Sequence, residues 1–259
     1  MLKMKNNYFQ RLFWILVIAG IWKAISLSGL FSPLIFPSPE TVLKSFYLSL
    51  LNGELIRQTI ISLSLILRGL IISLIIALIL SLLAISSKTF AGMVETLLAI
   101  AHPLPGIALM PLVLIWFGAG TKAIIFIIVH SVLWPLVLNL LTGFRAIPEI
   151  YRLVGENYGL NSLKIMWYIM TPASLPYFLA GIKIGWARAW RALISAEMLF
   201  GAAGGIGGLG WYIFKKRVFF DIPGVFAGLI VIVIIGVLVE DLLFNKVEDI
   251  TVKRWGMQI

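Results

Sequence analysis

Long apolar runs are the feature that most limits how this chain can fold, since each is long enough to cross a bilayer as an α-helix. About six runs are present, at approximately residues 9–28, 59–86, 92–117, 122–143, 174–199 and 222–245. A soluble domain could not cover them, because 61% of the 259 residues are apolar and only 12% are charged. Backbone groups in a bilayer must bond to one another, which favours helices. The sequence therefore predicts an all-α membrane protein with about six transmembrane helices.

Charge and cysteine content exclude several classes of protein. The net charge of +10 would indicate nucleic-acid binding in a soluble chain, but in a membrane chain basic cytoplasmic loops explain it. We therefore expect membrane lipid, and no nucleic acid, as a partner. The chain has no cysteine, which excludes disulfides and cysteine-based metal or redox sites. Its two histidines are accompanied by no carboxylate motif, so we expect no metal site.

Basic residues also predict the orientation of the chain. With the N-terminus inside, ten basic residues fall in inner segments and six in outer ones. We therefore expect a multi-pass protein of the cell (inner) membrane with both termini cytoplasmic, although the cluster Lys215-Lys216-Arg217 would then lie outside. The first apolar run continues as Lys23, Ser26 and Gly29 without a cleavage site, so we interpret it as a retained span rather than a signal peptide.

Two segments between the runs carry helix signals of their own. In segment 31–57, Ser38 precedes Pro39 and can cap an amphipathic helix lying outside the core. The longest inner segment, about 144–173, is polar and amphipathic. Pro148 can open a helix there, and Gly159 can end it with a left-handed residue.

A second short helix is expected after that glycine. Asn161 or Ser162 can cap it, and its apolar positions share one face: Leu163, Met166 and Trp167. The segment 144–173 is then a helix, a glycine turn and a helix at the cytoplasmic surface. Taken alone, such a segment could equally be an amphipathic hairpin lying in the membrane interface.

The same segment resembles the "EAA" loop of binding-protein-dependent ABC permeases, Glu-Ala-Ala-x3-Gly-x9-Ile-x-Leu-Pro. Gly159 is followed after nine residues by Ile169-Met170-Thr171-Pro172. Other stretches are similar to the alkanesulfonate, taurine, nitrate and bicarbonate permease group, and the resemblance covers roughly 35–257: Phe36-Pro37-Ser38-Pro39, Leu109 to Gly118, Pro172 to Pro176, Ala196-Glu197-Met198 and Arg254-Trp255-Gly256-Met257. Their order and spacing together are specific.

The chain departs from the EAA pattern at two places. Leu153-Val154-Gly155 stands where the family has Glu-Ala-Ala, and Thr171 replaces the leucine before Pro172. A contact made by the missing acid is therefore absent, or is supplied by Glu149 or Glu156.

The resemblance implies the type I ABC importer permease fold over residues 31–257, after an N-terminal segment and first span at 1–30. It implies two permease chains, which we expect to be two copies of this chain, with a heterodimer as the open alternative, and a periplasmic or lipid-anchored substrate-binding protein. It also implies a cytoplasmic ABC ATPase that receives the coupling loop, about 144–173, through these residues: Gly155, Glu156, Gly159, Leu163, Met166, Trp167 and Pro172. The chain has no Gly-x4-Gly-Lys-Ser/Thr sequence, so we expect no catalytic residue and no cofactor here, with ATP and Mg²⁺ on the partner ATPase.

Ionisable residues within spans are candidates for a translocation pathway, because a charge at the bilayer centre costs about 2.5–3.5 kcal/mol or more. Lys183, Arg188 and Arg191 fall on one broad helical face at 100° per residue, which predicts an electropositive path for a small anion such as a sulfonate, nitrate or bicarbonate. Alternatively, Lys183 reaches the inner headgroups and Arg191 pairs with Glu197. The candidate pathway residues are Arg188, Arg191, Glu197, His102 and His130, although His130 could equally be a packing residue.

Three further alternatives stay open. The glycine-rich run 201–210 is typical of a flexible external loop, but it also fits an outer gate where the backbone approaches the solute. The transported solute could be another small organic nutrient. An ATP-independent channel or a membrane-embedded enzyme would need a repeated pore-lining motif or a catalytic triad, and we find neither pattern in the sequence.

Overall fold

The computed structural model describes residues 2–200 and 207–252. The motif Arg254-Trp255-Gly256-Met257 and the part 201–206 of the glycine run lie outside the described residues. Within the described residues, five helices are long and apolar enough to cross a membrane, and they correspond to five of the six predicted apolar runs. They are α1 (Leu2–Leu27), α3 (Glu54–Ser86), α6 (Thr121–Ala146), α9 (Thr171–Phe200) and α11 (Ile222–Leu238), which continues through a π-helical segment, η4 (Val239–Phe244), into α12 (Asn245–Ile250).

The run 92–117 is not one straight span, and that part of the prediction is wrong. It forms α4 (Lys88–Ala101), a 3₁₀ turn η1 (Gly106–Leu109) and α5 (Met110–Phe117), and the axis bends by 86° between α4 and the segment Gly106–Phe117. Pro103 and Pro105 lie at the bend, and a proline can neither donate the helical hydrogen bond nor leave room for the preceding turn. The described chain therefore has five spans, or six if the bent pair counts as one.

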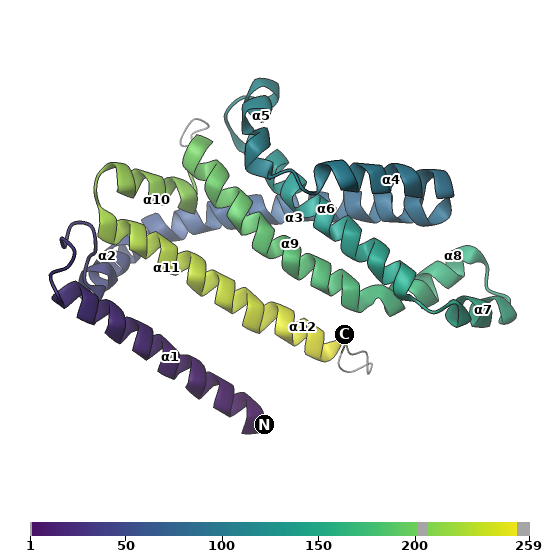
Figure 1. Cartoon of the computed structure of the whole chain (residues 1–259), viewed down its shortest axis with the longest axis horizontal. Coiled ribbons are helices and arrows are strands. Elements are labelled where there is room, and N and C mark those ends of the chain that lie inside the picture. Colours follow the sequence, from purple (N-terminus) through teal and green to yellow (C-terminus); the bar gives the residue numbers. More distant parts are fainter. Residues whose placement is uncertain (1, 201–206, 253–259) are drawn as a thin grey trace.

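Helices α3, α6 and α9 form the centre of the molecule, and their buried apolar residues belong to one continuous core (Figure 1). Small residues bring these helices close together. Gly69 of α3 lies directly on the side chain of Ile128, and a Cβ atom at Gly143 of α6 would lie 2.7 Å from the Cβ of Tyr177 in α9. Close packing through small residues is how membrane helices gain contact where lipid is as apolar as their side chains.

We expect Gly69→Val to destabilise the folded chain by about 1–3 kcal/mol, the usual cost of forcing extra methyl groups into a packed core. The added side chain would overlap Ile128, whose exposed fraction is 0%. Thermal unfolding in detergent measures the change. Gly92→Ala in α4 is the control, because a Cβ atom there meets nothing within 4 Å. Equal melting temperatures for the two variants would contradict the expectation.

The segment before α3 contains α2 (Pro39–Leu51), and its predicted N-cap is confirmed. The Ser38 side chain accepts a hydrogen bond from the Thr41 amide at 3.3 Å. The expectation that this helix lies outside the core is wrong in part, since α2 packs on α11 and α3 and buries Val42 completely. Lys23 of α1 pairs with Glu40 at 2.6 Å, and this hydrogen bond lowers the pKa of the Glu40 carboxyl to about 2.

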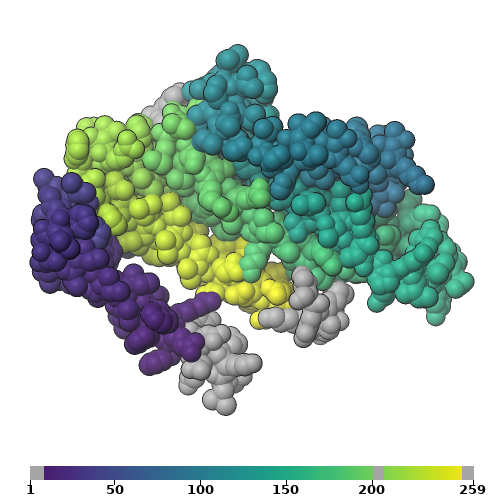
Figure 2. Space-filling view, viewed as in Figure 1, coloured from purple at the N-terminus to yellow at the C-terminus, as the bar shows by residue number. Residues whose placement is uncertain are grey.

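The ends of the helices gather at two ends of the molecule. In Figure 1, the turn from α3 to α4 and the pair α7 (Glu149–Asn157) and α8 (Ser162–Ile165) lie at the right end, and the start of α1 and the end of α12 lie on the lower side. Helices α2 and α10 (Leu209–Val218) lie at the other end. In Figure 2, α1 forms the edge of the molecule. The cytoplasmic location of both termini and of the hairpin stays a prediction.

Candidate functional site

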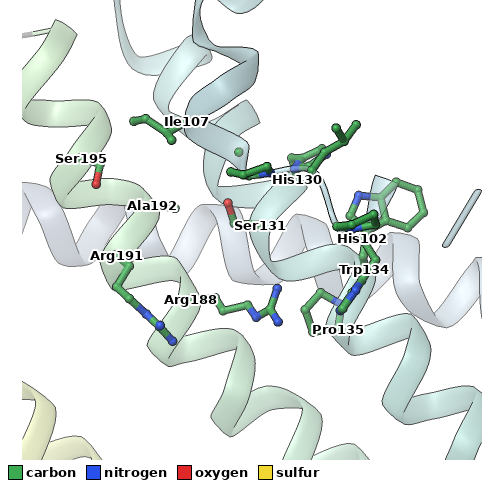
Figure 3. A pocket seen from close by; sticks show the side chains of 14 residues that line it. His102, Ile107, His130, Ser131, Trp134, Pro135, Arg188, Arg191, Ala192 and Ser195 are labelled. Atoms are coloured by element: carbon green, nitrogen blue, oxygen red, sulfur yellow. The ribbon is translucent and has the colours of Figure 1, made fainter. Parts of the chain in front are cut away.

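A cavity of about 340 Å³ lies where the bend after α4 meets α6 and α9 (Figure 3). The described residues that line it come from three segments: His102 to Ile107, then His130, Ser131, Trp134 and Pro135, then Arg188, Arg191, Ala192 and Ser195. None of these is acidic. The cavity therefore combines two guanidinium groups with histidine, serine and tryptophan side chains in the middle of the helical body.

Prolines and a glycine build the wall of the cavity on the side of α6. A Cβ atom at Gly106 would lie 2.5 Å from the Ser131 hydroxyl, so only glycine lets η1 lie this close to α6. Pro135 has no N–H, which leaves the Ser131 carbonyl without its usual helical donor four residues later. Freed carbonyls are tolerated at membrane depth where they face protein or a cavity.

The two arginines of the cavity differ in their surroundings. Arg191 donates from Nε to the carbonyl of Ala187 at 3.2 Å. Arg188 has no hydrogen-bond or ion-pair partner among the described residues, and Figure 3 shows its guanidinium extending toward Pro135 of α6. An unpaired guanidinium at membrane depth is costly, and facing a polar cavity lowers that cost. Arg188 is therefore the cation of the cavity that is free to bind an anion.

Two ring nitrogens beside Arg188 also lack partners. His130 Nδ1 and Trp134 Nε1 are buried and have no hydrogen-bond partner within the described part of the chain. The two rings meet edge to face, with centroids 6.3 Å apart. An indole N–H only donates, so the buried Trp134 nitrogen lacks an acceptor among the described residues.

The structure brings together four of the five predicted pathway residues: His102, His130, Arg188 and Arg191. It does not place Glu197 among them, because this carboxylate is buried between helices, where it binds Ser62 and the amide of Gly210. The suggested pair of Arg191 with Glu197 is therefore wrong. Ser131 and Trp134 also line the cavity, although neither is among the five predicted pathway residues. Pro135 in the sequence is a signal that could have found them, because a proline within a span frees backbone groups where a cavity or a neighbour can satisfy them.

Lys183 does not share the cavity with the two arginines, so the expectation of three cations on one path is wrong. Its ammonium pairs with Glu240 of η4 at 2.5 Å. The helical angle placed Lys183 on the same broad face, but the neighbouring C-terminal helix supplies a carboxylate for it. The alternative in which Lys183 reaches the headgroups stays a prediction, because its side chain is partly exposed beside Glu240.

At the end of the molecule that carries α7 and α8, the predicted helix, glycine turn and helix are confirmed. Gly159 has φ of +70°, and its amide donates to Glu156 while the amide of Leu160 donates to Gly155 at 3.0 Å. This is the glycine-centred end of a helix expected from the sequence. Asn161 then caps α8 by accepting from the Lys164 amide at 2.9 Å, and the π-helical segment η2 (Met166–Met170) leads into α9.

The packing around Gly155 explains why a glycine stands at this position of the Glu-Ala-Ala pattern. It is buried, and a Cβ atom there would lie 2.8 Å from Ile169 Cδ1 and 2.9 Å from Ile165 Cγ1. The missing side chain lets α7 pack directly on α8 and η2. Glu156 is exposed and lies 3.5 Å from Arg152.

The apolar residues of this hairpin do not share one buried face. Leu163 and Trp167 are 69% and 63% exposed, whereas Met166 is half-buried and Ile165 is buried. Other exposed apolar or aromatic side chains cover α7 and the turns: Ile150, Tyr151, Leu153, Val154, Tyr158 and Tyr168. Pro172, at the start of α9, follows Thr171, whose hydroxyl binds the Met166 carbonyl at 2.9 Å. Apolar exposure on this scale is typical of a surface that contacts either a partner protein or membrane lipid.

A cavity that holds two arginines, within a body of membrane-length helices that carries an apolar hairpin at one end, is an arrangement suited to a membrane-embedded transporter subunit. Residues 69–249 match the family described as the binding-protein-dependent transport system inner membrane component, and the chain belongs to this family. The predicted all-α ABC permease class is thereby confirmed, and such permease subunits are not themselves enzymes.

Curated relatives agree with this assignment. The chain is 26% identical to the taurine transport system permease protein TauC of Escherichia coli, over 86% of this chain and 82% of TauC. It is 29% identical to the nitrate import permease protein NrtB of a Synechocystis species, over 87% of this chain and 83% of NrtB. It is also 29% identical to the bicarbonate transport system permease protein CmpB of Synechococcus elongatus, over 66% of this chain and 62% of CmpB.

Proposed function

We propose that this chain is the membrane-spanning permease subunit of an ATP-driven importer for a small anion. The observation that carries the proposal is the cavity at Arg188, whose guanidinium is unpaired among the described residues and whose described lining contains no acid. The relatives support the same solute class, since taurine, nitrate and bicarbonate each carry a small oxyanion group. A cavity lined by cations and N–H donors would favour such solutes over cations.

The ATPase partner would dock on the hairpin of α7 and α8. ATP and Mg²⁺ would be bound by that partner. The hairpin is stiffened by the packing at Gly155 and continues through η2 into α9. Sixteen residues separate Pro172 from Arg188, so a push on the hairpin would act along about 24 Å of one helix before it reaches the cavity.

Two further partners complete the proposed importer. A second copy of this chain would close the pathway, because the cavity is lined by one side of a single helical body and Arg191 is exposed in the single chain. A substrate-binding protein would approach the end formed by α2 and α10, opposite the hairpin. Both termini would then be cytoplasmic.

Reconstitution in liposomes with the partner ATPase and binding protein tests the proposal. We expect uptake of nitrate, bicarbonate or an alkanesulfonate that requires both ATP and the binding protein. An ATPase that binds but cannot hydrolyse ATP is the control, and it should support no uptake. Anion flow without ATP would instead identify a channel and would overturn the proposal.

A further inference from the structure

Glu197 lies in a buried contact between α3, α9 and α10, and this contact is not part of the cavity described above. Its exposed fraction is 1%, and its carboxylate accepts from the Ser62 hydroxyl of α3 at 2.9 Å and from the Gly210 amide of α10 at 2.7 Å. The Ser62 oxygen in turn accepts from the Leu209 amide at 2.8 Å. One carboxylate and one hydroxyl thus hold the first two amides of α10 to α9 and α3.

Glycines are required on the α10 side of this contact. A side chain at Gly208 would overlap both the Glu197 carboxylate and the Ser62 hydroxyl. At Gly210, a Cβ atom would lie 2.6 Å from the Ile194 carbonyl and 2.7 Å from the Glu197 Cβ. Gly208 and Gly210 are therefore explained by close packing between helices and not by the flexibility of a loop.

The carboxylate has no cation beside it. Among the described residues the nearby basic groups are engaged elsewhere, since Lys215 binds Glu54 at 2.6 Å and Lys216 binds Asp221 at 2.9 Å. The unsatisfied amides at the start of a helix stabilise a negative charge, and this is what α10 provides to Glu197. Separating α10 from α9 would take the Gly210 amide away from this buried carboxylate and leave it one described donor, the Ser62 hydroxyl, which is unfavourable for a buried charge.

Two more contacts fix α10 along its length. The Tyr212 hydroxyl, on a side chain that is 0% exposed, lies 3.0 Å from the Ser49 hydroxyl of α2. The Lys215 contact ties the last turn of α10 to the start of α3. Helix α10 is therefore tied to α2, α3 and α9 by polar contacts, and it also packs beside the start of α11 (Figure 1).

We infer that Glu197 is a positioning residue that, with Ser62, locks α10 to α3 and α9, so that these helices move as one body during transport. The expected effect on uptake rests on the proposed function, whereas the expected effect on the packing of α10 does not. Helix α9 carries Ser195 and Ala192 on the cavity, two and five residues before Glu197. Loosening this contact would let the cavity end of α9 move without the helices that surround it.

Hydrogen exchange of the α10 amides in the full complex tests the inference. In the unchanged chain, the peptide containing Leu209 and Gly210 should exchange equally slowly without nucleotide and with trapped ATP. Glu197→Ala and Ser62→Ala should each speed its exchange by about tenfold or more, because the first removes the acceptor of the Gly210 amide and the second removes the acceptor of the Leu209 amide. Uptake per ATP hydrolysed should fall by about tenfold, and Glu197→Gln, which keeps an acceptor oxygen, should recover part of it.

Ser64→Ala is the matched control, because the Ser64 hydroxyl binds only the Ile61 carbonyl of its own helix. Ser62→Ala removes a single oxygen and is the milder variant. If the Glu197→Ala complex does not assemble, the exchange of the Ser62→Ala variant decides the test. Loss of protection in one nucleotide state of the unchanged chain would overturn the inference, as would unchanged exchange in both variants. The exchange measurement needs no transported solute, so it would stand even if none of the tested anions were taken up.

Discussion

Arg188→Ala should lower the initial rate of anion uptake by about tenfold to a hundredfold while the complex still assembles. A hydrogen bond to a charged group contributes about 1.5–3 kcal/mol, and each 1.4 kcal/mol corresponds to a factor of ten. Arg188 makes no hydrogen bond or ion pair with the rest of the described chain, so its removal takes away no such contact from the fold. The loss should therefore fall on transport and leave thermal stability unchanged.

Two variants make this prediction specific. Arg188→Lys keeps the charge and should retain part of the uptake, although a lysine lacks the planar fork that binds two oxygens at once. Arg68→Ala removes an arginine from another span, α3, where the side chain is exposed and does not line the cavity. It should transport normally. Equal uptake by the Arg188→Ala variant and the unchanged chain would exclude Arg188 from the pathway.

Features set by neighbouring residues were predictable from the sequence. The apolar runs gave the five long helices, because length and hydropathy alone decide whether a helix can cross a bilayer. The hairpin was equally local, since Pro148, Gly159 and Asn161 act within a few residues of themselves. Each of these residues fixes a helix end through its own backbone or side chain.

Features that depend on distant residues were not predictable in the same way. The bend at Pro103 and Pro105 has a local cause, but its 86° angle depends on how η1 packs at Gly106 against α6. The cavity itself joins segments about 30 and 60 residues apart in sequence, and no periodicity connects them. Helical angles placed Arg188 and Arg191 on one face correctly, yet they could not say that Lys183 would meet Glu240.

The contacts of Glu197 also depend on distant residues and could not be predicted from the sequence. Its angle on α9 put it beside the predicted cationic face, and a carboxylate near arginines suggested an ion pair. The observed partners are a serine more than 100 positions earlier and a backbone amide after the glycine run. A glycine-rich sequence does not reveal whether its glycines allow motion or close contact, and here Gly208 and Gly210 allow close contact.

Gly159→Pro should leave the spans inserted but reduce ATP-driven uptake by about a hundredfold. The position has φ of +70°, whereas proline fixes φ near −65°, and its amide donates to Glu156 at 2.9 Å. A proline at this position would therefore abolish both the backbone angle and the hydrogen bond with which α7 ends. A misplaced proline costs about 3 kcal/mol in the stability of a helix. This cost lowers the population of the correctly formed hairpin by roughly a hundredfold, and coupling requires that hairpin.

Gly159→Asn is the matched control, because asparagine adopts left-handed backbone more readily than other residues with a side chain. A Cβ atom at this position meets nothing within 4 Å, so size alone should be tolerated. Uptake, ATPase activity and co-purification of the ATPase should be measured together for both variants. Loss of co-purification would place the defect in docking, while ATP hydrolysis without uptake would place it in coupling. Normal uptake by the proline variant would show that this hairpin does not transmit the motion of the ATPase.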